Sequence, residues 1–313
     1  MTQAKGAAAR ISYVAEVTRN TTPNTPSMKK LAAAVYGETL GPKIGNVMSR
    51  AIRGTRGRST PRAGEIRVDG TVPFELAPLG LASLLKQALG SAANPSGSDP
   101  YTHVIKRGAL PAGITIEKGF TDLGRYFVHT GCLVNGMNLN ISAEDSLVTG
   151  AFDFIGMGHS TSGSSLGSPS SVVHNPFTEF ECEIEEGGSA VTLLNFAMQY
   201  QNDIERVAGI GTRYAVGLNE GEGTLDYTAT LMFESMTHVD KWLNETVTSM
   251  QVTMDDGTNS IEILLPKAKY FGDSAPKIAT PQGIVVELSG MAYYDTSEAT
   301  DIKVTVVNSE ATI

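Results

Sequence analysis

Apolar residues occupy every second position in a series of short runs, and this period is the feature that most constrains the fold. In the run 64–76, Ile66 and Val68 are spaced two apart, the pattern of a strand with one buried face. Runs of the same kind lie at 112–119, 126–129, 137–142 and 147–155. A chain built from such runs, with 33 glycines among 313 residues, is predicted to be mainly β.

Two segments carry a helical period instead. In the first, the apolar side chains at i, i+3, i+4 and i+7 are Leu81, Leu84, Leu85 and Ala88. Gly90 follows them at the place of a helix C-cap. In the second, the side chains on one face are Met236, Val239 and Leu243. We expect one helix in each half of the chain, lying outside the sheets and packed through these side chains.

The order of these segments occurs twice along the chain. Residues 223–234 align without a gap with 64–75, and residues 252–257 repeat the pattern of 114–119. A closing strand that contains glycine ends each series. Identities between the copies are few, so the interpretation depends on the order of the segments. We expect two tandem domains, residues 1–157 and 176–313, joined by a Gly/Ser-rich linker at 158–175. A surface loop within a single domain is the alternative for that segment.

The two halves differ in charge. Residues 1–157 carry 17 Lys and Arg against 11 Asp and Glu, a net charge of +6, whereas residues 158–313 carry 7 against 22, a net charge of −15. The total of −9 argues against general affinity for nucleic acid, which needs cations that neutralise phosphates. Halves of opposite sign that alternate around a closed ring would make every lateral contact attractive. Three chains with two similar domains each would form such a ring, with three-fold symmetry and a near six-fold outline.

Motifs for catalysis, cofactors or metals are missing. The five histidines are scattered, and Cys132 and Cys182 have no metal-ligand spacing, so both are expected to be buried thiols. The sequence has neither a phosphate-binding Gly-x-x-x-x-Gly-Lys loop nor a nucleophile elbow with partners. Residues 255–257 (Asp-Asp-Gly) fit a hairpin turn better than a calcium loop. We therefore expect no enzyme and no cofactor. A hydrolase with a shallow site is the weakest alternative. No apolar run is long enough to span a membrane.

Charged loops are the best candidates for contact sites. The segment before the first long strand carries Arg50, Arg53, Arg56, Arg58 and Arg62. The corresponding segment of the second half ends with Glu220 and Glu222. Loops of opposite sign suit surfaces that meet between subunits or between rings. A basic loop that binds nucleic acid is the alternative, but this loop has no aromatic side chains among its arginines.

Several blocks of the sequence resemble the major tail tube proteins of long non-contractile-tailed bacteriophages (siphophages). They are residues 49–54 ahead of the strand, 84–90, 114–122, 130–135 and 148–156. The likeness extends from about Ser12 to Val307 and depends on the order of the blocks. It implies two tail-tube-like domains, each a β-sandwich rolled toward a barrel and flanked by one α-helix. A chain with two such domains is similar to the minority of tail tubes that are built from trimers.

The resemblance also implies a function. Such proteins are structural virion proteins whose rings, here trimeric and pseudo-hexameric, stack into the phage tail tube, the conduit for DNA ejection. The implied partners are other copies of the chain and the tape-measure, tail terminator and baseplate or tail-tip proteins. Double-stranded DNA would pass without specific binding, helped by acidic side chains that face inward. The implied location is the phage tail, after synthesis in the host cytoplasm. The loops 50–62 and 206–222 would connect stacked rings.

An adhesive or carbohydrate-binding β-sandwich protein with two domains is the alternative function. Such a protein would present exposed aromatic side chains at its binding face. The one tryptophan, Trp242, lies on a predicted helix face instead.

Overall fold

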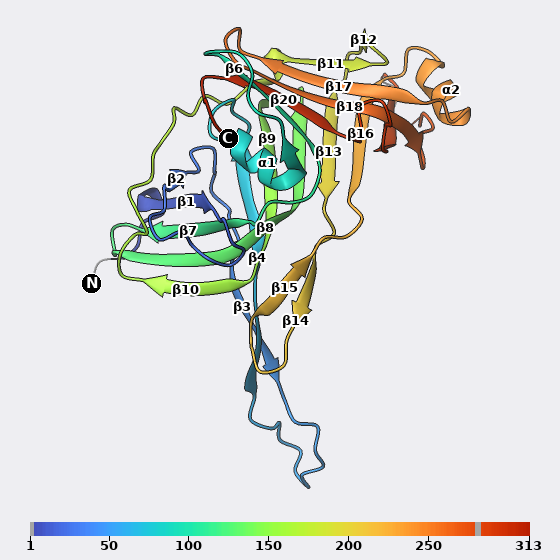
Figure 1. The fold of residues 1–313 in the computed structure, drawn as a ribbon. Helices are drawn as coiled ribbons and strands as arrows, with labels where there is room; N and C mark the ends of the chain where they lie inside the picture. Colours follow the sequence, from blue (N-terminus) through green and yellow to red (C-terminus); the bar gives the residue numbers. More distant parts are fainter. Residues whose placement is uncertain (1–2, 279–282) are drawn as a thin grey trace.

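The computed structural model describes residues 3–278 and 283–313 and is built mainly from antiparallel β-strands (Figure 1). Eighteen strands belong to one continuous hydrogen-bonded system, and two more form a separate hairpin. Two α-helices and two short 3-10 helices, η1 (Gly6–Ala8) and η2 (Glu179–Glu181), complete the described residues. The mainly β fold predicted from the two-residue period is confirmed.

The first outer sheet is built from the N-terminal half of the chain. Its strands, in spatial order, are β2 (Lys29–Lys30), β1 (Ala9–Ala15), β7 (Ile114–Phe120), the first part of β8 (Arg125–Ser142) and β10 (Gly158–Ser162). The two runs expected at 126–129 and 137–142 are parts of the single strand β8. This strand bends at Gly131, where φ is 61°, a value that glycine adopts without strain.

The central layer, called the long sheet here, crosses both halves of the chain. Its strands, in spatial order, are β3 (Gly41–Val47), β4 (Arg62–Glu75), β9 (Asp145–Gly156), the second part of β8, β13 (Asn195–Gln201), β16 (Thr224–Met232), β19 (Val285–Ala292) and the end of β18 (Ser260–Phe271). One face of this sheet covers the apolar core, and the other is polar.

The second outer sheet lies against the C-terminal part of the long sheet. Its strands, in spatial order, are β12 (Ser189–Ala190), β11 (Cys182–Glu186), β17 (Thr248–Asp255), the first part of β18, β20 (Lys303–Asn308), β6 (Tyr101–Arg107) and β5 (Gly90–Ala92). The hairpin predicted at residues 255–257 joins β17 to β18, and the backbone N–H of Gly257 donates to Asp255 there.

The strands of the two halves have the same order of neighbours. In the first half β4 pairs with β9 and β9 with β8, and in the second half β16 pairs with β19 and β19 with β18. Both β8 and β18 then continue into an outer sheet. The halves meet where β8 pairs with β13 and where β6 pairs with β20. One apolar core cluster contains side chains from both halves.

The two helices confirm the predicted positions but differ in burial. In α1 (Ala82–Leu89), Leu84, Leu85 and Ala88 are buried, as expected. In α2 (Thr237–Leu243), only Val239 is buried. The expectation that Met236 and Leu243 pack into the core is wrong for the isolated chain, because they are 49% and 61% exposed.

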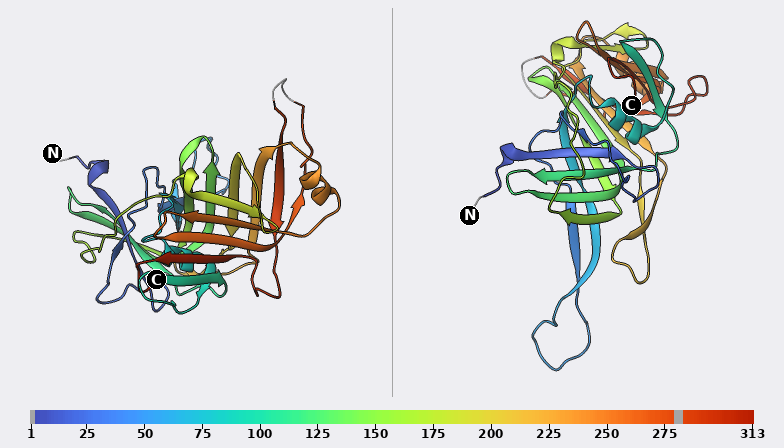
Figure 2. Two further views of the ribbon diagram at one scale, coloured as in Figure 1. Left: turned by 90° about the horizontal axis from the view of Figure 1, so that it is seen from above. Right: turned by 60° about the vertical axis from the view of Figure 1, so that its left-hand side comes forward.

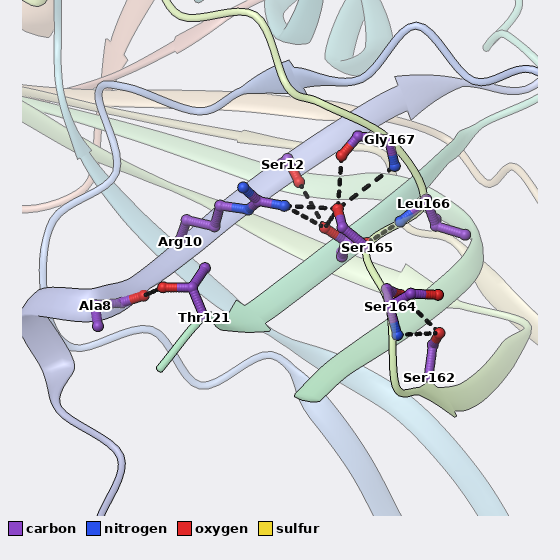
Figure 3. A network of polar contacts seen from close by, with 10 residues as sticks. Ala8, Arg10, Ser12, Thr121, Ser162, Ser164, Ser165, Leu166 and Gly167 are labelled. Carbon is purple, nitrogen blue, oxygen red and sulfur yellow. Dashed lines mark hydrogen bonds and ion pairs between the residues drawn. The ribbon is translucent and has the colours of Figure 1, made fainter. Parts of the chain in front are cut away.

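The segment expected as a flexible linker, residues 158–175, is held to the first outer sheet. Its first five residues form β10. Further on, the buried carboxylate of Glu117 accepts hydrogen bonds from Leu166 N at 2.6 Å and from Ser165 Oγ at 2.8 Å. Arg10 and Ser12 join the same network from β1 (Figure 3). These contacts hold the segment against the sheet at several points. The domain boundaries around it remain a prediction, and their ranges include residues 1–2 and 279–282, which lie outside the described residues.

Candidate assembly surfaces

The strands β3 and β4 extend beyond the rest of the molecule and end in a long loop (Figures 1 and 2). We call residues 48–61 the arm. The predicted contact residues Arg50, Arg53, Arg56 and Arg58 lie on it, and Arg62 begins β4 at its base. All five are exposed, and none makes an ion pair within the part of the chain that the structure describes. Ile52, between two of them, is fully exposed.

The hairpin β14 (Glu205–Ala208) and β15 (Ala215–Asn219) lies beside the base of the arm. Arg206 forms an ion pair with Glu65 and donates to Ile66 O at 3.2 Å. Arg213 Nε donates to Gly64 O at 2.8 Å. The hydrogen bond from Arg206 lowers the pKa of Glu65 below its usual range. The structure thus brings the segments 50–62 and 206–222 to the same end of one chain.

The predicted acidic residues of the second segment do not touch the arm. Glu220 accepts a hydrogen bond from Leu110 N at 3.3 Å, and Glu222 is exposed. The ion pair that the second segment does form, with Glu65 on β4 just beyond residues 50–62, has the reverse signs, since the arginine lies on the second half and the glutamate on the first. Spacing in the sequence could not show this, because it depends on where the hairpin folds back.

The outward face of the long sheet is lined by amide and hydroxyl side chains. The uncharged members of this polar face are Thr71, Asn138, Asn140, Thr149, Asn195, Gln199, Gln201, Thr224, Thr228, Thr230 and Ser289. In the middle row Gln199 lies between Asn138 and Asp226 on the adjacent strands. A hollow of about 540 Å³ lies on this face. Alternation of polar and apolar residues in the sequence predicted such faces, but not which strands would be neighbours.

The cations of the polar face are all paired with carboxylates. Lys43 forms an ion pair with Asp69, Arg67 lies 3.2 Å from Glu65, and Lys269 lies 3.6 Å from Glu245. Three further carboxylates, Asp153, Asp226 and Glu287, lie on the same face without a cation within 4.0 Å among the described residues. Among the described residues, the long-sheet strands therefore present no unpaired Lys or Arg from this face to a polyanion.

Both ends of the long sheet are incomplete. The strand β3 pairs with β4 along one edge, and its other edge has no partner strand in residues 3–278 and 283–313. At the far end, residues Lys269–Phe271 pair with β19, while β17 stops pairing with β18 at Ala268. Apolar side chains are exposed at both ends, Ile44 on β3 and Leu243 on α2. Open strand edges of this kind favour pairing with another chain.

Each outer sheet contains a buried titratable group whose pKa is shifted. In the first, His129 stacks on His159 with ring centroids 5.0 Å apart, and burial lowers the pKa of His129 to about 3. In the second, burial opposes the charge of Glu186, but its contacts with His238 and Lys241 outweigh this effect and lower the pKa of Glu186 to about 2. Both groups belong to paired strands of the outer sheets, His129 to β8 and Glu186 to β11.

Within the described residues, no group of three or more His, Cys, Asp or Glu side chains is arranged to hold a metal ion. Neither helix among them is long and apolar enough to cross a membrane. Both cysteines are free thiols, Cys132 buried and Cys182 half-buried.

A comparison with protein families gives one result that bears on these surfaces. The family model described as phage tail tube protein matches residues 6–292. That range takes in the arm, both helices and every strand of the long sheet. A search of curated proteins found no match.

Proposed function

The chain belongs to the phage tail tube protein family, and on this premise we propose that its copies close into rings which stack to form the tail tube. Membership makes the protein a structural component of the phage tail. More specifically, we propose a tail tube of the siphophage type. The polar face of the long sheet would line the lumen, and genomic DNA would pass through the lumen.

The single observation that carries the proposal is the pair of unmatched ends of the long sheet. The joint between β8 and β13 inside the chain is a complete antiparallel pairing of seven residue pairs. We propose that the open edge of β3 in one chain pairs with the open end of β18 in the next chain, which forms a second joint of this kind between chains. Because the two edges differ, the contact is heterologous and generates a ring when the rotation closes.

We propose that three chains close the ring. Each chain would contribute two similar units, with domain boundaries near 1–157 and 176–313, so that internal joints and joints between chains alternate. The net charges of +6 and −15 support this order, because neighbours of opposite sign attract and like units are kept apart. The tape-measure, tail terminator and tail-tip proteins would be the further partners of such a tube.

The polar face supports a role in the passage of DNA. A duplex carries one negative charge per ~1.7 Å of its axis, so a lining with free Lys or Arg would bind it and slow its passage. Amides, hydroxyls and unpaired carboxylates give weak repulsion instead, over a Debye length of about 8 Å. A tube with this lining needs no catalytic group, and we propose none.

Electron microscopy of the concentrated protein tests the proposal. Wild-type protein is expected to form rings and tubes, with end-on averages of three-fold symmetry and near six-fold outline. Leu243→Glu places a charge at the open end of the long sheet and is expected to leave monomers. Val173→Glu, the same kind of change at a 77% exposed site on the 163–175 segment, is the matched control and should assemble. Wild-type protein that stays monomeric at high concentration would contradict the proposal.

A further inference from the structure

A cavity of about 320 Å³ lies at the end of the molecule opposite the arm. Figure 1 shows this end, with β11 and β12 at the top and the arm at the bottom. The cavity lies between β11, the end of β8 and the start of β13, and its apolar lining includes Ile141, Ile184 and Leu193. At about 30 Å³ for one water, it has room for roughly ten water molecules, or for one or two side chains of another protein.

The rim of this cavity is acidic and has no cation of its own. Residues 126–205 contain no Lys or Arg, and the cavity lies entirely within that range. Glu179 and Glu183 line the cavity, and Glu185 follows on the same strand. None of the three forms an ion pair with a described residue, and the Oε2 atom of Glu179 is buried without a hydrogen-bond partner. Phe180, at 88% exposure, extends from the same rim.

The arm has the complementary composition. Between residues 48 and 64 the chain carries five arginines and no Asp or Glu. Ile52 lies between Arg50 and Arg53, so one apolar side chain is flanked by two guanidinium groups. An apolar floor with a carboxylate rim fits that sequence, since arginine pairs with carboxylates through two parallel hydrogen bonds and also stacks on aromatic rings.

We propose that the cavity at β11 and β13 is the receptor for the arm of another copy in the adjacent ring, an inference that rests on the proposed tube. Ile52 enters the cavity, while Arg50 and Arg53 pair with the glutamates of the rim. The strand β11, whose residues line the cavity, lies at the end of the molecule opposite the arm (Figure 1), so the contact is head-to-tail. A head-to-tail contact between rings repeats without limit and gives an open stack rather than a closed pair of rings.

Charge reversal on each side tests this contact. We expect Arg50→Glu with Arg53→Glu to form rings but to shorten tubes at least tenfold, because like charges then meet at the cavity. Glu183→Arg with Glu185→Arg should have the same effect. A chain with all four changes restores opposite signs and is expected to recover tube length. Asp99→Arg with Asp122→Arg, at exposed positions away from the cavity, makes the same change in net charge as the Glu183 and Glu185 variant and should leave tubes at wild-type length.

The lengths of tubes in electron micrographs separate the possible outcomes. Shortened tubes with intact rings, and recovery in the fourfold variant, support the receptor. Tubes of normal length with either reversed pair, or a fourfold variant that stays as single rings, would overturn it. Neither of those outcomes would contradict the proposal that the wild-type protein forms a tube. Wild-type protein without rings would refute the proposed function itself.

Discussion

The helices α1 and α2 follow equivalent strands, β4 and β16, but their surroundings differ. Six of the eight residues of α1 are buried, against one of seven in α2. The helix α1 packs against β5, β6 and β8 of its own half. The second half adds hydrogen bonds, since Asn202 donates to Ala88 O and Lys86 donates to Ile313 O. The charged contacts of α2 run to Glu186 on β11, within its own half. The helix is thus mostly buried in the first half of the chain and mostly exposed in the second.

The strands beside the helices repeat this contrast. Pairing is complete on both edges of β13, whereas β3 is paired on one edge alone within the described residues. Five of the seven residues of β3 are exposed. In the proposed ring, one chain makes one lateral joint by itself and presents the two sides of another. Exposed Leu243 and Met236 would then belong to an interface between chains.

Truncation of one leucine side chain in each helix should give the largest difference in the free energy of unfolding. Leu84→Ala removes a fully buried side chain of α1 and is expected to lower the free energy of unfolding by about 2–5 kcal/mol. Leu243→Ala removes an exposed side chain of α2 and should change it by no more than about 0.5 kcal/mol in the monomer. Urea denaturation of dilute protein measures both. Equal losses would contradict the assignment of α2 to a surface.

Loss of the hydrogen bonds made by Asn202, where the two halves meet, should give the next largest change in the free energy of unfolding. The Nδ2 of Asn202 donates to Ala88 O at 2.8 Å and to Val134 O at 2.9 Å, and Tyr200 donates to its Oδ1. Asn202→Ala leaves these buried carbonyls unpaired and is expected to cost about 1–3 kcal/mol. Hydrogen exchange at α1 should rise with it and stay unchanged at α2. A uniform rise at both helices would show that the clamp does not belong to one joint.

The two outer sheets should differ in their response to acid. His129 has a folded pKa of about 3, below the 6.5 of the unfolded chain, so the unfolded state takes up a proton first as the pH falls. Stability is therefore lost from pH 6.5 downward, by about 1.4 kcal/mol at pH 5.5. His129→Phe should remove this part of the pH dependence, as measured by urea denaturation at pH 7.5 and 5.5. An unchanged slope in this variant would contradict burial of a neutral His129.

The contribution of Glu186 has a different window. Its folded pKa of about 2 lies below the 4.5 of the unfolded chain, so the stability it gives is present above pH 4.5 and is lost between pH 4.5 and 2. Glu186→Gln should therefore leave the slope between pH 7.5 and 5.5 unchanged. This variant is the control for His129→Phe, and a change in its slope above pH 5 would refute the separation of the two sheets.

The smallest expected effect is on DNA binding, when a cation is placed either on the polar face of the long sheet or on the outward side of the second outer sheet. Asp226→Lys puts a cation on the polar face, and tubes of this variant should bind duplex DNA with a salt slope steeper by about 0.9 for each added phosphate contact. Glu262→Lys makes the same change on the outward side of the second outer sheet and should not retain DNA inside the tube. Sedimentation of labelled duplex with tubes measures both. Equal binding by the two variants would contradict the polar face as the lining.

The sequence predicted the elements better than their surroundings. The alternation around Ile66 and the helical period at Leu84 each identified an element correctly. The runs 126–129 and 137–142 were expected as separate strands, but both lie within β8, which continues through Gly131 and past the bulge near Asn135. The period of α2 placed Leu243 on an apolar face, and no periodicity reveals whether the cover for that face lies in the same chain. The arm was recognised by its arginines, whereas the cavity proposed as its receptor depends on the spatial arrangement of β8, β11 and β13.

A high-resolution electron cryomicroscopy map of the assembled tube tests the central claim most directly. The account predicts β3 of one chain hydrogen-bonded to the β18 end of its neighbour near Lys269–Phe271, with Leu243 covered by that neighbour. A map in which the free edge of β3 faces solvent, or pairs with β3 of another copy, would contradict it.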